Sequence, residues 1–122
     1  MMQQALRLGL LAAVLWMSPA PAESLLPTQG DAVVVRMQEL PSEARETLQH
    51  IRQGGPFPYA RDGVEFRNYE RKLPHQPRGY YHEYTVRTPG VKSRGARRIV
   101  CGPLPECYYT ADHYRHFNRI QE

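Results

Sequence analysis

The chain has 122 residues, with sixteen Lys and Arg against twelve Asp and Glu and a formal net charge of +4 at pH 7. Charged residues make up 23% and hydrophobic residues 41%, which is typical of one globular domain and excludes a two-domain dinucleotide enzyme, a polytopic membrane protein and a repeat array. The positive charge favours an anionic partner, either a nucleic acid or a membrane surface.

Residues 1–22 have the features of a secretory signal peptide. Arg7 precedes an apolar run from Leu8 to Met17, and Ala20-Pro21-Ala22 fits a small-x-small cleavage site. The run is shorter than the roughly 20 residues that span a bilayer. We therefore expect export, with cleavage near Ala22; the alternative is an uncleaved anchor helix.

The next segment, 23–39, has no strong periodicity and is treated as an N-terminal extension, although 32–35 fits a short strand or a docking segment. A helix is expected from about Pro41 until Gly54-Gly55-Pro56. Its apolar residues recur at i, i+4 and i+7, so it should pack through one face; they are Ala44, Leu48 and Ile51.

Short strands follow the helix along the rest of the chain. They are predicted at 64–66, 80–87, 96–101, 108–110 and 116–120. One helix followed by sequential strands predicts an α+β domain at 40–122, with the amphipathic helix near its N-terminus packed on a twisted antiparallel sheet. Alternation along 80–87 places His82 on the expected core face, where a structural role is favoured.

The two cysteines, Cys101 and Cys107, are separated by five residues. In an exported protein this pair favours a disulfide that closes a small loop. Two thiols without a further C-x2-C pair make a poor zinc site.

The charge is unevenly distributed along the chain. Residues 23–63 contain four basic and six acidic side chains, whereas 64–119 contain eleven basic and five acidic ones. All eight tyrosines lie between Tyr59 and Tyr114. Basic groups interleaved with aromatic rings suit single-stranded nucleic acid, but a solvated basic face over a Tyr-rich core explains them equally well.

Three features suggest acid–base chemistry. Glu83 is an acid within an aromatic strand, and His113 follows Asp112 near the end of another. A basic cluster on the intervening hairpin is expected to lie close to Glu83; it consists of Lys92, Arg94, Arg97 and Arg98. Together these groups could transfer protons around a phosphate, although each one alone is commonly a surface residue. No H-E-x-x-H spacing is present, and His113 with His116 is only a weak metal candidate.

Several segments resemble the guanyl-specific microbial ribonucleases related to barnase. They run in the family's order from about Leu40 to Ile120: Leu40-Pro41-Ser42-Glu43-Ala44, Gly55-Pro56-Phe57-Pro58-Tyr59, Tyr80-Tyr81-His82-Glu83-Tyr84-Thr85-Val86, Arg94-Gly95-Ala96-Arg97-Arg98-Ile99 and Tyr108-Tyr109-Thr110-Ala111-Asp112-His113-Tyr114. The resemblance implies the microbial ribonuclease fold.

The resemblance also implies a catalytic set. Glu83 matches the general base that takes the ribose 2′-hydroxyl proton, and His113 matches the general acid that protonates the departing 5′-oxygen. Arg94 and Arg98 match the arginines that hold the phosphate, and Tyr114 a neighbouring phosphate contact. The family product is a 2′,3′-cyclic phosphate that is then hydrolysed to a 3′-phosphate, with no metal or cofactor.

A guanine-reading loop is implied at Phe66, Arg67, Asn68, Tyr69 and Glu70. The Glu70 carboxylate would accept hydrogen bonds from guanine N1–H and the N2 amine, and backbone N–H groups near Asn68 would meet O6. Tyr69 stands where the family pattern has Arg, and a tyrosine ring can also stack on a base.

The expected partner is single-stranded RNA, and the resemblance allows a barstar-like protein inhibitor as a second one. We expect a monomer without stable membrane association. Two other functions fit the residues: a basic RNA-binding domain without turnover, which would not need Glu83 or His113, and a toxin module acting through a protein partner.

Overall fold

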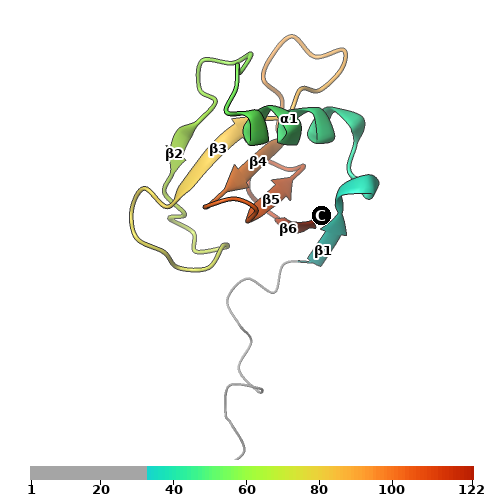
Figure 1. The fold of residues 1–122 in the computed structure, drawn as a ribbon. Coiled ribbons are helices and arrows are strands. Elements are labelled where there is room, and N and C mark those ends of the chain that lie inside the picture. Colours follow the sequence, from blue (N-terminus) through green and yellow to red (C-terminus); the bar gives the residue numbers. More distant parts are fainter. Residues whose placement is uncertain (1–32) are drawn as a thin grey trace, which may run out of the picture.

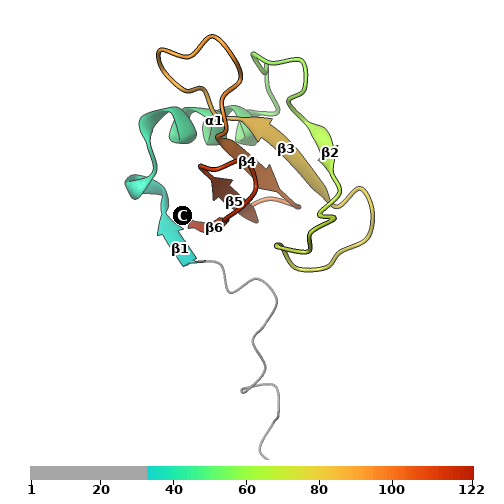
Figure 2. The same cartoon turned by 180° about the vertical axis from the view of Figure 1, so that it is seen from behind.

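The computed structural model describes residues 33–122 of the chain, so the predicted signal peptide at 1–22 and most of the predicted extension lie outside the described residues. The elements in chain order are β1 (Val33–Arg36), the 3₁₀ helix η2 (Met37–Glu39), α1 (Ser42–Gln53), β2 (Val64–Phe66), β3 (Tyr81–Thr85), β4 (Arg98–Cys101), β5 (Cys107–Thr110) and β6 (Asn118–Gln121). One six-stranded sheet has the order β1-β6-β5-β4-β3-β2, and α1 lies across one of its faces (Figures 1 and 2).

The helix begins and ends where the sequence predicts. Pro41 precedes α1 in an extended conformation, and its carbonyl accepts hydrogen bonds from the Ala44 and Arg45 N–H groups at 3.0 and 3.1 Å. Gly54 ends the helix in the left-handed region, with φ of 77° that a residue with a Cβ would adopt only at a cost. The predicted stripe of Ala44, Leu48 and Ile51 is buried.

The sheet is mixed rather than wholly antiparallel. Strands β2 to β6 pair antiparallel with their neighbours, whereas β1 runs parallel to β6. The helix therefore follows a first strand, and residues 33–39, which the sequence analysis placed in an extension, include an edge strand of the sheet. This pairing joins positions more than 80 residues apart in the sequence, so no local sequence pattern predicts it.

All the predicted strands exist, and three of the five are shorter than predicted. The segment predicted at 80–87 forms a strand over Tyr81–Thr85, and the one predicted at 96–101 begins only at Arg98. His82 is partly exposed rather than a core residue, and its Nδ1 lies 3.0 Å from the Gly63 carbonyl oxygen.

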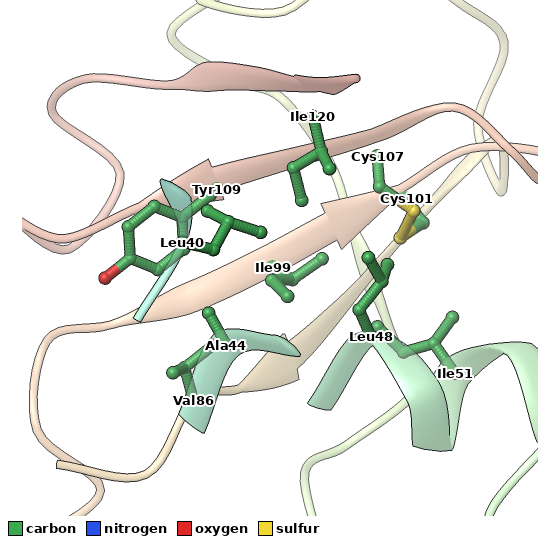
Figure 3. Packing of buried hydrophobic residues seen from close by; sticks show 10 residues of the cluster. All are labelled: Leu40, Ala44, Leu48, Ile51, Val86, Ile99, Cys101, Cys107, Tyr109 and Ile120. Carbon is green, nitrogen blue, oxygen red and sulfur yellow. A yellow bond between two sulfur atoms is a disulfide. The ribbon is translucent and has the colours of Figure 1, made fainter. Parts of the chain in front are cut away.

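Apolar side chains cover both faces of the sheet. Between α1 and the sheet, Ala44 and Leu48 belong to a buried cluster that also contains Val86, Ile99 and, from β6, Ile120 (Figure 3). A second cluster on the opposite face contains Leu73, Tyr81, Val100, Tyr108 and Phe117. A strand residue in the middle of this sheet is therefore buried whichever face it points to.

Cys101 and Cys107 form the predicted disulfide. They are paired opposite one another at the ends of β4 and β5, and both belong to the cluster under the helix (Figure 3). The loop between them carries Glu106, whose carboxylate accepts hydrogen bonds from the Tyr80 and Tyr108 hydroxyls at 2.6 and 2.9 Å.

Within residues 33–122, no helix is both long enough and apolar enough to cross a membrane.

Replacing Cys101 and Cys107 with Ala is expected to lower the free energy of unfolding by about 2 kcal/mol. The effect is modest because a short loop constrains the unfolded chain less than a long one. Urea unfolding with linear extrapolation measures it. Leu104→Ala, at a half-exposed position in the same loop, serves as the control and should change the value by less than about 0.5 kcal/mol. Equal midpoints for the double variant and the parent would contradict the prediction.

Candidate active site

The carboxylate of Glu83 lies in the middle of β3 and is buried, with 8% of the residue exposed. The Tyr114 hydroxyl donates a 2.8 Å hydrogen bond to its Oε2, and Arg94 Nη2 lies 3.7 Å from its Oε1. A buried carboxylate is costly without such partners, so these two contacts make its position in the strand tolerable. As predicted, the basic hairpin reaches Glu83.

Arg94 and Arg98 are both fixed beside this strand. Arg94 donates from Nε and Nη2 to Thr85 Oγ1 at 3.1 and 2.8 Å. Arg98 is 3% exposed, and its Nη1 donates to the carbonyls of Gly95 and Arg97 at 3.1 and 2.7 Å. Its buried Nε finds no acceptor among the described residues. Both guanidiniums are thus held on the chain before any substrate arrives.

The rest of the predicted basic cluster lies apart from Glu83. Arg97 Nη2 is 3.3 Å from Glu43 Oε2 on α1, so Arg97 forms an ion pair with the helix. Lys92 is exposed in the loop before β4. Of the four basic residues that are clustered in the sequence, only Arg94 and Arg98 therefore belong to the candidate site.

His113 and Tyr114 lie in a tight turn between β5 and β6. Both have left-handed backbones, with φ of 53° and 72°, which non-glycine residues adopt only where the surroundings hold them. The His113 N–H donates to the Ala96 carbonyl at 2.8 Å, and the exposed His113 ring lies 4.7 Å from the Tyr114 ring. Tyr114 thereby contacts both His113 and Glu83.

Thr110 and Asp112 hold the turn together. The buried Thr110 Oγ1 accepts a 3.1 Å hydrogen bond from the Tyr114 N–H and donates to Asp112 Oδ1 at 3.0 Å. Asp112 also accepts from the His116 N–H and contacts the His116 ring. Hydrogen bonds from His116 lower the pKa of Asp112 well below its usual value. His116 is therefore a partner of Asp112 in this turn.

The Tyr114 hydroxyl is set up to remain a donor. Burial, together with its hydrogen bond to Glu83, raises its pKa to about 12, while the positive charge of Arg98 works in the opposite direction. The phenol is therefore protonated throughout the neutral range, and it faces the carboxylate as O–H rather than as a second negative charge.

Asn68 fixes the shape of the loop that follows β2. Its side-chain Oδ1 accepts from the Leu73 N–H at 3.1 Å, and its Nδ2 donates to the Leu73 carbonyl at 2.9 Å. Its own backbone is left-handed, with φ of 55°, a conformation that Asn tolerates better than most residues. The loop's backbone is thus held by an amide side chain rather than by the sheet.

This loop and the turn that carries His113 and Tyr114 share a recess of about 150 Å³, lined by Phe66, Asn68, Tyr69, Glu70, Lys72, Tyr114 and Phe117. The Phe66 ring stacks on the Tyr114 ring at 5.2 Å. Tyr69 is 78% exposed, and its hydroxyl accepts a 2.7 Å hydrogen bond from Arg67. The structure therefore gathers four of the five predicted guanine-loop residues with Tyr114. Arg67 instead lines an adjoining recess that reaches Glu83.

Lys72 connects the two halves of the site. Its Nζ donates a 2.7 Å hydrogen bond to the Arg115 carbonyl, next to Tyr114 in the turn, and lies 3.8 Å from Glu70 Oε2. Neither Lys72, Thr110 nor Asp112 was singled out for a role from the sequence. The closely spaced Thr and Asp before His113 are a typical signal of a side-chain-bonded turn, whereas the Lys72 contact spans 43 residues and leaves no local signal.

Among residues 33–122, no three His, Cys, Asp or Glu side chains are grouped so that they could hold a metal ion.

Comparison with known proteins matches the chain to one family. A family model described as ribonuclease matches residues 22–121. The chain is 60% identical over 82 residues to guanyl-specific ribonuclease Sa3 of Kitasatospora aureofaciens, covering 66% of this chain but only 58% of that protein. It is 54% identical over 89 residues to guanyl-specific ribonuclease Sa of the same organism, covering 72% of this chain and 93% of that protein.

Solved structures give the same result. A crystal structure of ribonuclease Sa2 with guanosine-2′-cyclophosphate has a TM-score of 0.70 at 49% identity, over 74% of this chain and 96% of that one. A structure of ribonuclease Sa2 from a study of its mononucleotide complexes has a TM-score of 0.73 at 48% identity, over 75% and 95% of the two chains. With its fold, its site and its sequence in agreement, the chain belongs to the ribonuclease family, among the microbial guanyl-specific enzymes.

Proposed function

We propose that this protein is an exported, guanyl-preferring endoribonuclease of single-stranded RNA. In the first step the 2′-oxygen of a guanosine attacks the adjacent phosphorus, the bond to the next nucleotide's 5′-oxygen breaks, and a 2′,3′-cyclic phosphate forms. In the second step water opens the cyclic phosphate to a 3′-phosphate. Family membership and the arrangement around Glu83 support both steps.

The buried Glu83 carboxylate is the observation that carries the proposal. Its two oxygens contact a hydroxyl and a guanidinium, so it sits at a fixed position beside groups that suit a phosphate. In the proposed role Glu83 takes the 2′-hydroxyl proton as the P–O bond forms. A merely structural carboxylate would be placed more cheaply at an exposed position of the strand.

His113 is the proposed acid of the first step. Its ring is exposed beside Tyr114, on the turn that also meets Glu83. As an imidazolium it would give a proton to the departing 5′-oxygen, and as an imidazole it would take one from water in the second step. Glu83 would then return its proton to the 2′-oxygen, so both groups end as they began.

Arg94, Arg98 and Tyr114 are the proposed phosphate contacts. Negative charge grows on the phosphate oxygens as the new bond forms, and fixed donors stabilise it most because they need no rearrangement. The positive charge of Arg98 works against the raised pKa of the Tyr114 hydroxyl, so these two proposed contacts lie close together. The raised pKa of Tyr114 keeps its hydroxyl protonated, and this single O–H, which donates to Glu83 in the structure, would turn to a phosphate oxygen when substrate binds.

Guanine is the proposed base because of the recess beside Asn68. Glu70 lines it and offers two carboxylate oxygens for the N1–H and N2 donors of guanine, which no other common RNA base presents together. Phe66 and the exposed Tyr69 ring provide flat faces for stacking. Backbone N–H groups of the loop held by Asn68 would meet guanine O6.

The proposed reaction carries its own nucleophile. Because the 2′-hydroxyl belongs to the substrate, no metal-bound water and no cofactor is required, and DNA, which lacks this hydroxyl, is not a substrate.

Export is supported by the apolar run from Leu8 to Met17 and by the small residues that end at Ala22. The disulfide between Cys101 and Cys107 supports it independently, because such bonds persist in oxidising compartments.

The activity is tested with the dinucleotide GpU in excess EDTA. We expect guanosine 2′,3′-cyclic phosphate to appear first and guanosine 3′-phosphate later, with ApU and CpU cleaved far more slowly. Glu83→Gln and His113→Ala should each lower kcat/KM by at least about 10², the usual contribution of a positioned acid or base. Chromatography of timed samples measures both results.

Glu46→Gln, at an exposed helix position, is the matched control and should keep the parental rate. If the parent protein binds RNA but leaves GpU intact, the protein is an RNA-binding domain rather than an enzyme. Loss of activity on adding EDTA would contradict the metal-free mechanism.

Asp112→Asn is expected to lower kcat about tenfold, because the turn that positions His113 and Tyr114 loses hydrogen bonds. It should also change the pH dependence of stability. The folded-state pKa of Asp112 lies below its unfolded value of 3.8, so its contribution is present above about pH 4 and lost as the pH falls further. The difference in Tm between parent and variant should therefore shrink between pH 5 and about pH 2.

Glu39→Gln, which removes an exposed carboxylate from η2, is the control for that series. A difference in Tm that is constant across the pH range would contradict the role assigned to the Asp112 charge.

Export is tested by the intact mass of protein recovered outside bacteria that express the whole chain. We expect a species that begins at Glu23. Recovered protein that still contains Met1 to Ala22 would contradict cleavage near Ala22.

A further inference from the structure

A second recess of about 230 Å³ adjoins the one proposed for guanine and is lined by Phe66, Arg67, Asn68, Tyr69, Arg71, His75, Gln76, Pro77, Arg78 and Tyr81. We propose that it binds the phosphate on the 5′ side of the guanosine, so that the enzyme holds RNA upstream as well as downstream of the base it reads. This inference rests on the proposed function and adds a subsite to it.

The lining of this recess is strongly basic. It contains three arginines and one histidine and no acidic residue. The Arg71 and Arg78 guanidiniums take part in no ion pair or side-chain hydrogen bond within the part of the chain that the structure describes, while Arg67 Nε is 4.0 Å from Glu65 Oε2. Two arginine charges are therefore left for an external anion, and a phosphodiester is the anion that a ribonuclease meets.

The position of the recess determines which phosphate it would take. It shares Phe66, Asn68 and Tyr69 with the recess proposed for guanine. No catalytic candidate lines it, whereas the guanine recess reaches Tyr114 and the adjoining recess reaches Glu83. Since the 3′-phosphate of the guanosine belongs at the catalytic groups, the strand can approach this recess only on its 5′ side.

The loop that carries these arginines is fastened at both ends. At one end the Arg71 N–H donates to the Asn68 carbonyl at 3.0 Å. At the other end the Gly79 N–H donates to Glu65 Oε1 at 2.9 Å, and the Tyr81 hydroxyl binds the Pro74 carbonyl at 2.7 Å between them. The guanidiniums thus project from an anchored backbone, which reduces the entropy lost when an anion binds.

The test compares three substrates that are all cut after guanosine: GpU, pGpU with a 5′-phosphate, and UpGpU with a 5′-nucleotide. We expect kcat/KM for pGpU and UpGpU to exceed that for GpU by about 3- to 10-fold at low salt, the worth of one or two exposed charge contacts. The advantage should fall as salt is raised, because phosphate contacts release counterions.

Arg71→Gln with Arg78→Gln should remove this advantage and leave GpU cleavage at the parental rate, and Arg71→Lys with Arg78→Lys should restore part of it. The matched control, Arg36→Gln with Arg87→Gln, removes two exposed arginines outside the recess and should retain the full advantage. Thermal unfolding of each variant verifies folding.

The outcomes separate this subsite from the activity itself. If the parent leaves GpU intact, the proposed function fails. If GpU is cleaved and the 5′-phosphate gives no advantage, or the glutamine variant keeps it, the subsite is wrong. An advantage for UpGpU without one for pGpU would mean that the recess takes a nucleoside rather than a phosphate, and would also overturn the proposal.

Discussion

The hydrogen bond from Tyr114 to Glu83 is the contact on which the rest of the site depends. A carboxylate in the middle of a strand is stable there only if donors replace the water it loses, and Tyr114 is the donor nearest to it. The same ring stacks on Phe66 and packs against the second apolar cluster. The core of the fold and the chemistry of the site therefore share one side chain.

That hydrogen bond requires an unusual backbone. Tyr114 meets Glu83 from a turn in which two successive non-glycine residues are left-handed, and the Thr110 hydroxyl and Asp112 carboxylate hold that conformation. Lys72 then binds the turn to the loop proposed to read the base. The segments proposed for base recognition and for proton transfer are thus parts of one hydrogen-bonded assembly rather than two independent pockets.

The sequence predicted features that are local in the chain. Pro41 and Gly54 mark the ends of α1 correctly because a helix boundary is set by a few neighbouring residues. The family resemblance located Glu83, Arg94, Arg98 and Tyr114, which the fold brings together. Arg97 could not be separated from Arg98 in this way: the two are adjacent in the sequence, yet Arg97 lies just before β4 and its side chain pairs with Glu43 on the helix.

Contacts between distant segments were not predictable in this way. The parallel pairing of β1 with β6 depends on two short strands at opposite ends of the domain, and β1 alone resembles any exposed apolar segment. The second cluster beneath Tyr114 was missed for the same reason, since Leu73 and Phe117 come from segments without regular periodicity. The cluster covers this face of the sheet, so Glu83 is buried there, and the contacts with Tyr114 and Arg94 offset the cost of that burial.

The order of strands has a practical consequence for handling the protein. β1 and β2 form opposite edges of the sheet, and the loop proposed to read the base follows β2, whereas the described chain begins at β1 beside β6 (Figure 1). A purification tag, a dye or a fused carrier protein joined ahead of Val33 would leave from the edge farthest from that loop. Attachment there suits immobilisation on a sensor surface, because the proposed RNA-binding loop lies at the opposite edge of the sheet.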